Sequence, residues 1–266
     1  NYASFEVSTI DKFNHRLIRT FAYDLKLPLN FEVELDTTNL LHKAVDKLID
    51  KAGTNKDLTK VLVDFAIEKA DNDKSWDVSY DFNNIAQLLI SENDVRYIDS
   101  LKGKTLEDFK ELKSQLTKTM TLLESKLINT ARETLELIVN YGLQFNDFSS
   151  SYLPKYFQKL VDGSFDVNFG LNWQQDLEDG STLYPKRVSS ETAALIDSIQ
   201  PKLLENFNQT KQQVIQYKFV KNVLNNITPL SVLNEINTSL QELKDEDDLL
   251  LISEFNALIS REIKNQ

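Results

Sequence analysis

The feature that most constrains this chain is a run of apolar residues, spaced three and four apart, between residues 106 and 138. This spacing places the apolar side chains on one face of an α-helix. The positions are Leu106, Phe109, Leu112, Leu116, Met120, Leu123, Leu127, Ala131, Leu135 and Ile138. They predict a helix of about 35 residues, roughly 50 Å long. A long core helix of an α bundle is the commoner explanation, and a helix that forms a coiled coil with a partner is the alternative.

The composition also favours long helices. Six Gly and five Pro in 266 residues are about 4% of the chain, against the roughly 12% of average usage. Such a chain has few sharp turns, and its 41% apolar residues suffice to fill a core. We therefore expect an all-α fold, an irregular multi-helix bundle with one long central helix and a few short extended segments. Residues 1–266 are expected to form a single helical domain.

The first residues alternate between apolar and polar, which predicts a short strand over 4–9. The pattern then becomes helical at Ser8 or Thr9 and stops at Pro28. The apolar stripe of this first helix is Ile10, Phe13, Leu17, Phe21 and Leu25. Alternation over residues 29–35 predicts another extended segment, which ends at Asp36, a residue suited to cap the next helix.

Helical periodicity continues through most of the remaining chain. Further helices are predicted over residues 40–49, 58–65, 85–89, 190–224, 230–243 and 247–264. Gly53 is expected to end the first of these, and Pro229 to interrupt the fourth. Residues 105–108, Thr-Leu-Glu-Asp, resemble a capping box before the long helix. Residues 142–190 concentrate glycine and aromatic residues, which predicts an irregular excursion.

Charge and residue usage exclude several functions. The formal charge of −11 opposes binding to a polyanion across the whole surface, so any contact with nucleic acid or anionic lipid must be local. The absence of cysteine excludes disulfides and thiolate metal sites, and two histidines nearly exclude a zinc site. No apolar run reaches the ~18 to 20 residues of a membrane span. The sequence thus predicts a soluble, cytoplasmic chain without a membrane partner, and its start at Asn1 suggests an excised or processed piece.

The motifs that suggest catalysis have simpler interpretations. Residues 103–105, Gly-Lys-Thr, lack the earlier glycine of a phosphate loop, since Ile98 stands there, and predict a turn followed by an N-cap. His15 and His42 lie within helices among charged neighbours, which is not typical of a general base. The acidic run 245–248 lacks the spacing of a calcium loop and is expected to be a solvated helix start.

Local positive charge is more informative, because it lies in three short stretches. These are Lys12, Arg16, Arg19 and Lys26 in the first helix, then Lys155, Lys159, Lys186 and Arg187, and finally Lys202, Lys211, Lys218 and Lys221. A charged stretch is most often a solvated face. Against the negative total charge, however, these are the candidate phosphate-contacting surfaces.

Residues 5–13, Phe-Glu-Val-Ser-Thr-Ile-Asp-Lys-Phe, run into a helix that continues Asn-His-Arg-Leu-Ile-Arg over 14–19. This stretch resembles the strand-to-helix motif, commonly Thr-x-His-Ser-Phe, of superfamily 1 helicases of the UvrD/RecB/AddA type. Residues 27–35, Leu-Pro-Leu-Asn-Phe-Glu-Val-Glu-Leu, with the helical stretch after them, resemble the helical 1B subdomain inserted into the first motor domain of these enzymes. The closing segment, from about residue 249, resembles the one that leads into their DExx-box strand.

The resemblance implies that the parent protein is an ATP-dependent DNA helicase, or a RecB-like helicase with exonuclease activity, in DNA recombination and repair. This chain would be its DNA-contacting accessory subdomain, with DNA and the ATPase core of the same parent chain as partners. Residues 1–9 and about 249–266 would connect to that core. The phosphate loop, the DExx acidic pair and the arginine-bearing motifs are absent from this sequence. ATP and Mg²⁺ would therefore bind to the parent protein, and we expect no cofactor, metal or catalytic residue in this chain.

The resemblance also places Thr9 and Lys12 at the single-stranded DNA track, with Phe13 packing that turn. Asp11 and Lys12 stand where the family commonly has His and Ser, so the contact expected at this turn is not the family's own. Combined with the basic stretches, the expected DNA-contacting residues are Thr9, Lys12, Phe13, Arg16, Lys211, Lys218 and Lys221.

An inserted subdomain leaves and re-enters its host at nearby points, so residues near Thr9 and near 258–264 are expected to lie close together. The alternative function is a helical protein-protein interaction scaffold with no nucleic-acid role, which would grip its partner through residues 106–138 and 142–190. A free-standing enzyme has the least support, because the sequence holds no recognisable nucleophile, metal or phosphate constellation.

Overall fold

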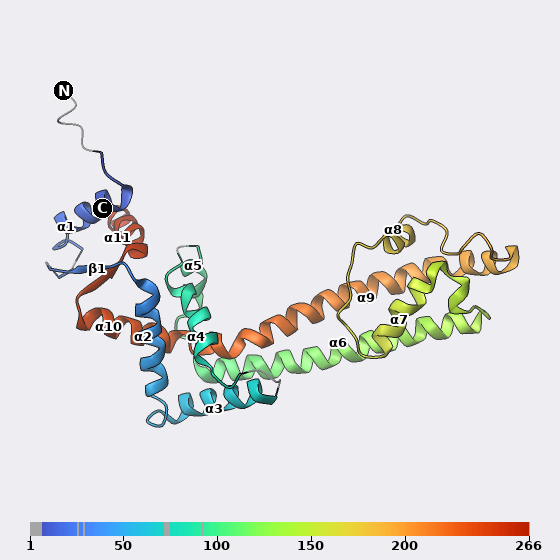
Figure 1. Cartoon of the computed structure of the whole chain (residues 1–266), viewed down its shortest axis with the longest axis horizontal. Coiled ribbons are helices and arrows are strands. Elements are labelled where there is room, and N and C mark those ends of the chain that lie inside the picture. Colours follow the sequence, from blue (N-terminus) through green and yellow to red (C-terminus); the bar gives the residue numbers. More distant parts are fainter. Residues whose placement is uncertain (1–6, 26, 29, 72–74, 92, 266) are drawn as a thin grey trace. The chain divides into compact units, whose positions relative to one another are not determined.

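The structure is a computed structural model that describes residues 7–25, 27–28, 30–71, 75–91 and 93–265. The described chain is predominantly helical, with two short strands, which confirms the predicted all-α class (Figure 1). Its contacts divide it into two compact units. Unit 1 comprises residues 1–110 and 227–266, and unit 2 comprises residues 111–226. These units are defined by contacts, whereas a domain is a part of the chain that folds cooperatively. The expectation that residues 1–266 form a single domain therefore stays a prediction.

Helix α1 (Ile10–Thr20) begins where the sequence predicts. The Oγ1 atom of its N-cap, Thr9, accepts a hydrogen bond from the backbone N–H of Lys12 at 3.3 Å. The helix ends at Thr20, and turns follow over residues 21–25, so it is shorter than predicted. Residues 7–9 are not a strand, and residues 4–6, Lys26 and Leu29 lie outside the described residues.

The buried face of α1 differs from the predicted stripe. Ile18 and, just after the helix, Ala22 are buried, whereas Ile10, Phe13 and Phe21 are exposed. The periodicity predicts the helix correctly, but Ile10, Phe13 and Phe21 of the predicted stripe stay exposed, and Leu17 is only partly buried.

Two strands join the beginning of unit 1 to its end. Strand β1 (Glu32–Glu34) pairs in parallel with β2 (Leu249–Leu251), with Val33 opposite Leu250. Helix α11 (Ile252–Asn265) follows β2 directly. The prediction of a helix over 247–264 is therefore wrong for its first five residues. Asp248 has a φ of +50° and breaks the helical path, and its carbonyl accepts a hydrogen bond from the N–H of Glu32 at 3.0 Å.

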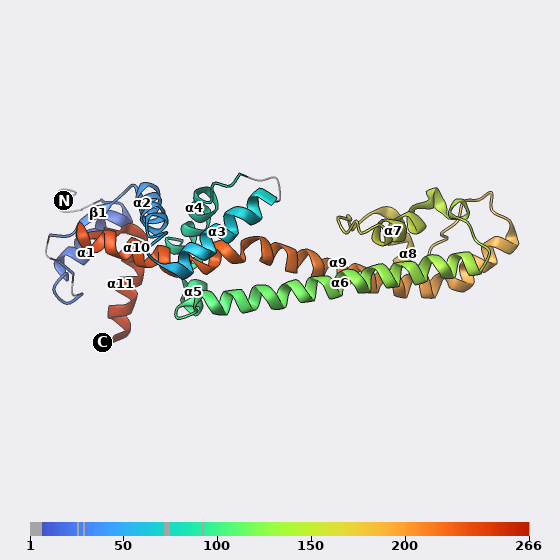
Figure 2. The ribbon, with the colours of Figure 1, turned by 90° about the horizontal axis from the view of Figure 1, so that it is seen from below.

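Most of the remaining elements of unit 1 pack around one apolar cluster. They are α2 (Thr37–Asp50), α3 (Lys56–Asp71), α4 (Ser79–Ala86), η2 (Gln87–Leu89) and α10 (Leu233–Glu246). The short elements α5 (Val95–Ile98) and η3 (Asp99–Leu101) follow η2, and α5 contacts it. The cluster joins Leu41 and Leu48 of α2 to Phe65 of α3, Phe82 of α4 and Ile236 of α10. A smaller cluster joins α1 to β2 and α11. Figure 2 shows helices α1 and α11 near each other.

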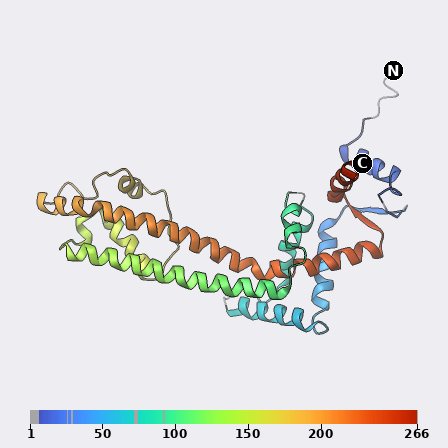
Figure 3. The same ribbon diagram turned by 180° about the vertical axis from the view of Figure 1, so that it is seen from behind.

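Unit 2 is built on two long helices, which run side by side in Figure 3. Helix α6 (Leu106–Asn140) has the predicted 35 residues, and α9 (Ser190–Ser231) has 42. The predicted capping box is confirmed, because the N–H of Thr105 donates to Asp108 at 2.7 Å and the N–H of Asp108 donates to Thr105 Oγ1 at 3.2 Å. Helix α9 continues two residues beyond Pro229 before it ends.

The segment 142–190 is more regular than predicted. It holds η4 (Phe145–Asp147), η5 (Ser149–Ser151), α7 (Tyr152–Val161) and α8 (Asn172–Glu178). Its aromatic rings fill the core of unit 2, where Tyr156 and Phe157 of α7 and Trp173 of α8 pack with Phe207 of α9. The excursion therefore supplies half of a hydrophobic core.

Phe157 tests this core, since its side chain is fully buried. Phe157→Ala is expected to lower the free energy of unfolding by about 3–5 kcal/mol, because it removes buried apolar surface and leaves a cavity. The control is Phe219→Ala on α9, which removes a ring that is 67% exposed and should change stability by less than about 0.5 kcal/mol. Urea unfolding measures both changes. Equal losses in the two variants would contradict the assigned core.

Candidate functional site

The two end segments of unit 1 meet at helices α1 and α11. The side-chain amide of Asn14 donates to Oδ1 of Asn256 at 3.3 Å, and the His15 ring stacks on Phe255 with the ring centres 6.2 Å apart. Leu258 and Ile259 of α11 pack against the buried cluster that contains Ile18. Helix α1 therefore lies against helix α11, while the expectation that Thr9 itself lies near residues 258–264 stays a prediction.

His15 has a packing role at this junction. Its Nε2 accepts a hydrogen bond from Nε of Arg19 at 3.2 Å, and its ring lies edge-on to Phe31. The Arg19 guanidinium also lies over the Phe31 ring, 5.5 Å from its centre, and donates to the Phe31 carbonyl at 3.4 Å. Arg19 and His15 therefore pack α1 against the segment that leads into β1.

An apolar surface remains uncovered beside this junction. Ile10, at 74% exposure, together with Phe13 and Phe21, lies at helical spacing along α1, and Ile263 of α11 is 70% exposed. Phe21 and Ile263 line the same cavity of about 260 Å³, whose lining is almost entirely aliphatic and aromatic. We call Ile10, Phe13, Leu17, Phe21 and Ile263 the end face. Clustered apolar residues at a protein surface are typical of a contact with another protein element.

The structure brings four of the predicted DNA-contacting residues together on α1. Thr9 caps the helix, while Lys12, Phe13 and Arg16 follow within its first two turns and are exposed. The other three, Lys211, Lys218 and Lys221, lie on α9 in unit 2. Each group belongs to a different unit.

Two of the α9 lysines are engaged within unit 2. Nζ of Lys211 forms an ion pair with Glu178 of α8 at 2.6 Å and lies near the rings of Phe169 and Phe207. Lys218 donates to the Val167 carbonyl at 2.8 Å and pairs with Asp166 at 3.3 Å. Both lysines thus hold the 166–178 segment against α9, a role that sequence spacing does not reveal.

Lys221 has a different environment. It is exposed, and its Nζ lies 5.9 Å from the centre of the Tyr217 ring. Burial, and then the Glu124 carboxylate, raise the pKa of Tyr217. Of the three expected DNA-contacting lysines on α9, Lys221 is the one whose amine no carboxylate pairs with in the described part of the chain.

The negative charge is unevenly distributed. Unit 2 holds 12 of the 30 basic and 13 of the 41 acidic residues, so its net charge is −1, whereas unit 1 carries −10. The repulsion of polyanions that the sequence predicts therefore arises almost entirely from unit 1.

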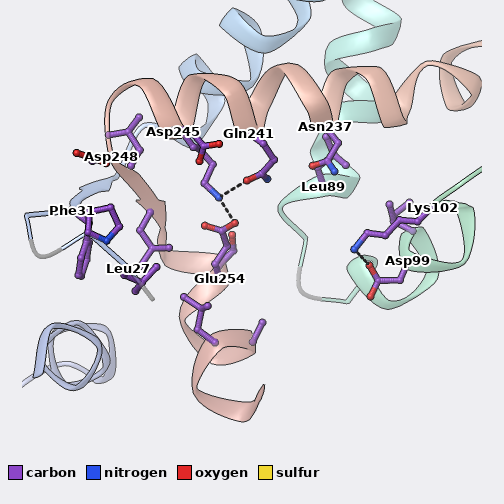
Figure 4. A pocket seen from close by; sticks show the side chains of 18 residues that line it. Leu27, Phe31, Leu89, Asp99, Lys102, Asn237, Gln241, Asp245, Asp248 and Glu254 are labelled. Carbon is purple, nitrogen blue, oxygen red and sulfur yellow. Dashed lines mark hydrogen bonds and ion pairs between the residues drawn. The ribbon is translucent and has the colours of Figure 1, made fainter. Parts of the chain in front are cut away.

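A cavity of about 750 Å³ lies in unit 1 between α10, α11 and η3 (Figure 4). Lys244 is buried there, pairs with Glu254 at 2.5 Å and donates to Gln241 at 3.3 Å. Lys102 pairs with Asp99 at 2.7 Å. The cations at this cavity are paired with carboxylates, and Lys244 links α10 to α11.

The acidic run 245–248 lies at this cavity, and its predicted role is wrong. It ends α10 and does not begin a helix. The negative charge therefore meets the unfavourable end of the helix dipole. Lysines nearby compensate for this charge. Lys47 pairs with Glu246 at 2.8 Å, and this hydrogen bond raises the pKa of Lys47.

Three further features bear on function: the turn at residues 103–105, metal-binding clusters and membrane-spanning helices. Residues 103–105 form the predicted turn and cap, with Gly103 at a φ of +81°. Among the described residues, no cluster of His, Cys, Asp or Glu has the arrangement of a metal site. No helix in the described ranges is long and apolar enough to cross a membrane.

Comparison with known proteins finds no matching family, no matching curated sequence and no matching solved structure.

Hydrogen exchange tests whether Lys211 holds residues 166–178 against α9. Lys211→Met removes the cation that holds Glu178 while keeping the apolar stem, so backbone amides of residues 166–178 should exchange hydrogen faster. Global stability should fall by no more than about 1 kcal/mol, the range of partly exposed ion pairs. Lys118→Met on α6, which removes an exposed lysine, is the control. Unchanged exchange in Lys211→Met would refute the assignment.

Tyr156 predicts how stability changes at alkaline pH. Burial raises the pKa of Tyr156 to about 12, and its hydroxyl contacts Thr210 Oγ1 at 3.0 Å. Because the folded-state pKa is raised, the stability from this group is fully present below pH 10 and is lost between about pH 10 and 12. The free energy of unfolding of the wild type should therefore fall by about 2–3 kcal/mol relative to that of Tyr156→Phe over this pH interval. Urea unfolding at several pH values measures the difference. A constant difference between the two proteins would contradict this.

Proposed function

We propose that this chain is a helical accessory unit of a larger ATP-dependent DNA helicase or helicase-nuclease of the UvrD/RecB type, which acts in DNA recombination and repair. The observation that carries the proposal is the meeting of α1 and α11 beside the uncovered end face. An insertion must have its two connections close together, and its contact with the host must lie next to them.

The end face supports the second half of this argument. Phe13 on α1, Phe21 directly after that helix and Ile263 on α11 are about half exposed or more. Covering these side chains would be favourable by about 25 cal/mol for each Å² of apolar surface removed from water. In the proposal, the ATPase core of the parent chain covers this surface. ATP and Mg²⁺ bind in that core, so this chain alone hydrolyses no ATP.

The DNA contacts are proposed on positions that are exposed in their own units. Lys12 and Arg16 stand one helical turn apart at the start of α1, next to Thr9 and Phe13. Lys221 provides a cation on α9. Lys211 and Lys218 belong to the proposed set as well, but their pairing with Glu178 and Asp166 makes Lys221 the stronger candidate.

One observation favours the alternative, a protein-protein interaction scaffold without a nucleic-acid role. Leu122 of α6 and Ile215 and Phe219 of α9 are each more than half exposed. If these side chains joined two copies, light scattering would show a mass that rises with concentration. The accessory-unit proposal expects the monomer mass at all concentrations.

DNA binding tests the proposal. Fluorescence anisotropy with labelled single-stranded and partly duplex DNA should show an affinity that falls steeply between about 50 and 200 mM salt, because bound lysines and arginines release counterions. The double variant Lys12→Glu/Arg16→Glu should lower the affinity by about tenfold or more. Turnover of ATP by the purified chain should be absent.

The matched control is Lys56→Glu/Lys60→Glu on α3, which reverses two charges at the same spacing within the same unit. It should lower the affinity much less. Equal losses in the two double variants, no binding at 50 mM salt, or ATP turnover by the chain would each contradict the proposal.

A further inference from the structure

Helix α7 presents two adjacent stripes of side chains to one cavity in unit 2. Tyr152 and Tyr156 form one stripe, and Lys155 and Lys159 form the other, and the members of each pair are four positions apart, about one helical turn. Trp173 of α8 lines the same cavity, which has a volume of about 360 Å³. This volume is at the lower end of the range for small-molecule sites.

The aromatic wall of the cavity is held in place. Tyr156 is 5% exposed and contacts Thr210, and the centre of the Trp173 ring lies 5.6 Å from that of Tyr156 and 5.5 Å from that of Phe207. Next to Trp173, the Gln174 side chain is 2% exposed. It accepts from the N–H of Leu171 at 3.1 Å and donates to the Asn168 carbonyl at 3.0 Å. The cavity therefore has a preformed wall.

The two lysines at this cavity differ from those on α9. Lys155 and Lys159 are exposed, and neither is paired with a carboxylate within the described ranges. Nζ of Lys155 is 3.5 Å from the Ser150 carbonyl. The one carboxylate lining the cavity, that of Asp166, pairs with Lys218 at 3.3 Å. The positive charge of the α7 lysines thus remains for a ligand.

We infer that this cavity binds a base of single-stranded DNA, with the base stacked on Tyr152 and in contact with Trp173, and with the adjacent phosphates at Lys155 and Lys159. Aromatic side chains beside a cationic path are how proteins hold single strands, because every base has a face to stack and a phosphate beside it. A base in a duplex is already stacked on its neighbours, so the site selects single strands. The near-neutral charge of unit 2 permits this contact. The inference rests on the proposed function and names the ligand of a site for it.

The chain offers a local reporter for the test, because it has two tryptophans, Trp76 and Trp173. Trp76→Phe leaves Trp173 as the only one. Titration with an oligothymidylate should quench Trp173 fluorescence, while anisotropy of the labelled oligonucleotide measures total binding in parallel. An oligonucleotide of equal length built of abasic sites should bind without quenching.

Two sets of variants in the Trp76→Phe background sharpen the test. Lys155→Glu/Lys159→Glu should weaken the quenching titration at least tenfold, and Tyr152→Ala should weaken it while Tyr152→Phe does not. Tyr152 is more than half exposed, so its truncation leaves the fold intact, and unchanged circular dichroism verifies this. Lys118→Glu/Lys126→Glu on α6 is the control for charge, since both lysines are exposed in the same unit.

The outcomes separate this inference from the proposed function. Binding by anisotropy without quenching of Trp173, or with undiminished affinity in Lys155→Glu/Lys159→Glu, overturns the base site and leaves the DNA-contacting function standing. Equal quenching by the abasic oligonucleotide also overturns the base site, because phosphates alone would then account for the signal. Quenching by thymidine monophosphate but not by the oligonucleotide shows a nucleotide pocket and overturns the single-strand assignment. Absence of binding in both readouts overturns both proposals.

Discussion

The structure of unit 1 depends on the packing of its first helix and strand against its last. Strands β1 and β2 pair in parallel although more than 200 residues separate them. A parallel pair always needs a long connection, and here residues 35–248, with all of unit 2, form that connection. The entropic cost of closing a loop rises only slowly with its length, so the large sequence separation of these segments adds little to the cost of bringing them together. The contacts of α1 with α11 also place the uncovered end face beside these two helices.

Features with a strong local signal were predictable from sequence. The 35-residue helix α6, its Thr105–Asp108 cap and the Thr9 and Asp36 caps all follow from short-range patterns, and the structure has them. The strand β2 was not predictable, because a run of three leucines suits a strand as well as a helix. Only its distant partner β1 decides between them. The sequence does not predict helix α7, because the glycine- and aromatic-rich composition of residues 142–190 favours irregular structure and obscures the short helical period within it.

The candidate site was predictable in part, and for a similar reason. Sequence identifies Lys12 and Arg16 as neighbours on one helix, since that relation is local. It cannot show that Glu178 and Asp166 approach Lys211 and Lys218, because those contacts depend on how a distant segment folds back on α9. Nor could it place Trp173 beside Lys155 and Lys159. Charge in a sequence identifies cations, whereas tertiary contacts decide which of them stay accessible to a ligand.

Cross-linking of α1 to α11 tests the central claim, that the two ends of unit 1 close on each other. The chain has no cysteine, so Asn14→Cys/Asn256→Cys introduces one thiol on each helix at positions whose native side chains are 3.3 Å apart. The shortest bis-methanethiosulfonate linker should join the two within one molecule, while each single variant should give only dimers. If both thiols react with a monofunctional reagent but no intramolecular cross-link forms, the closure does not exist and the account fails.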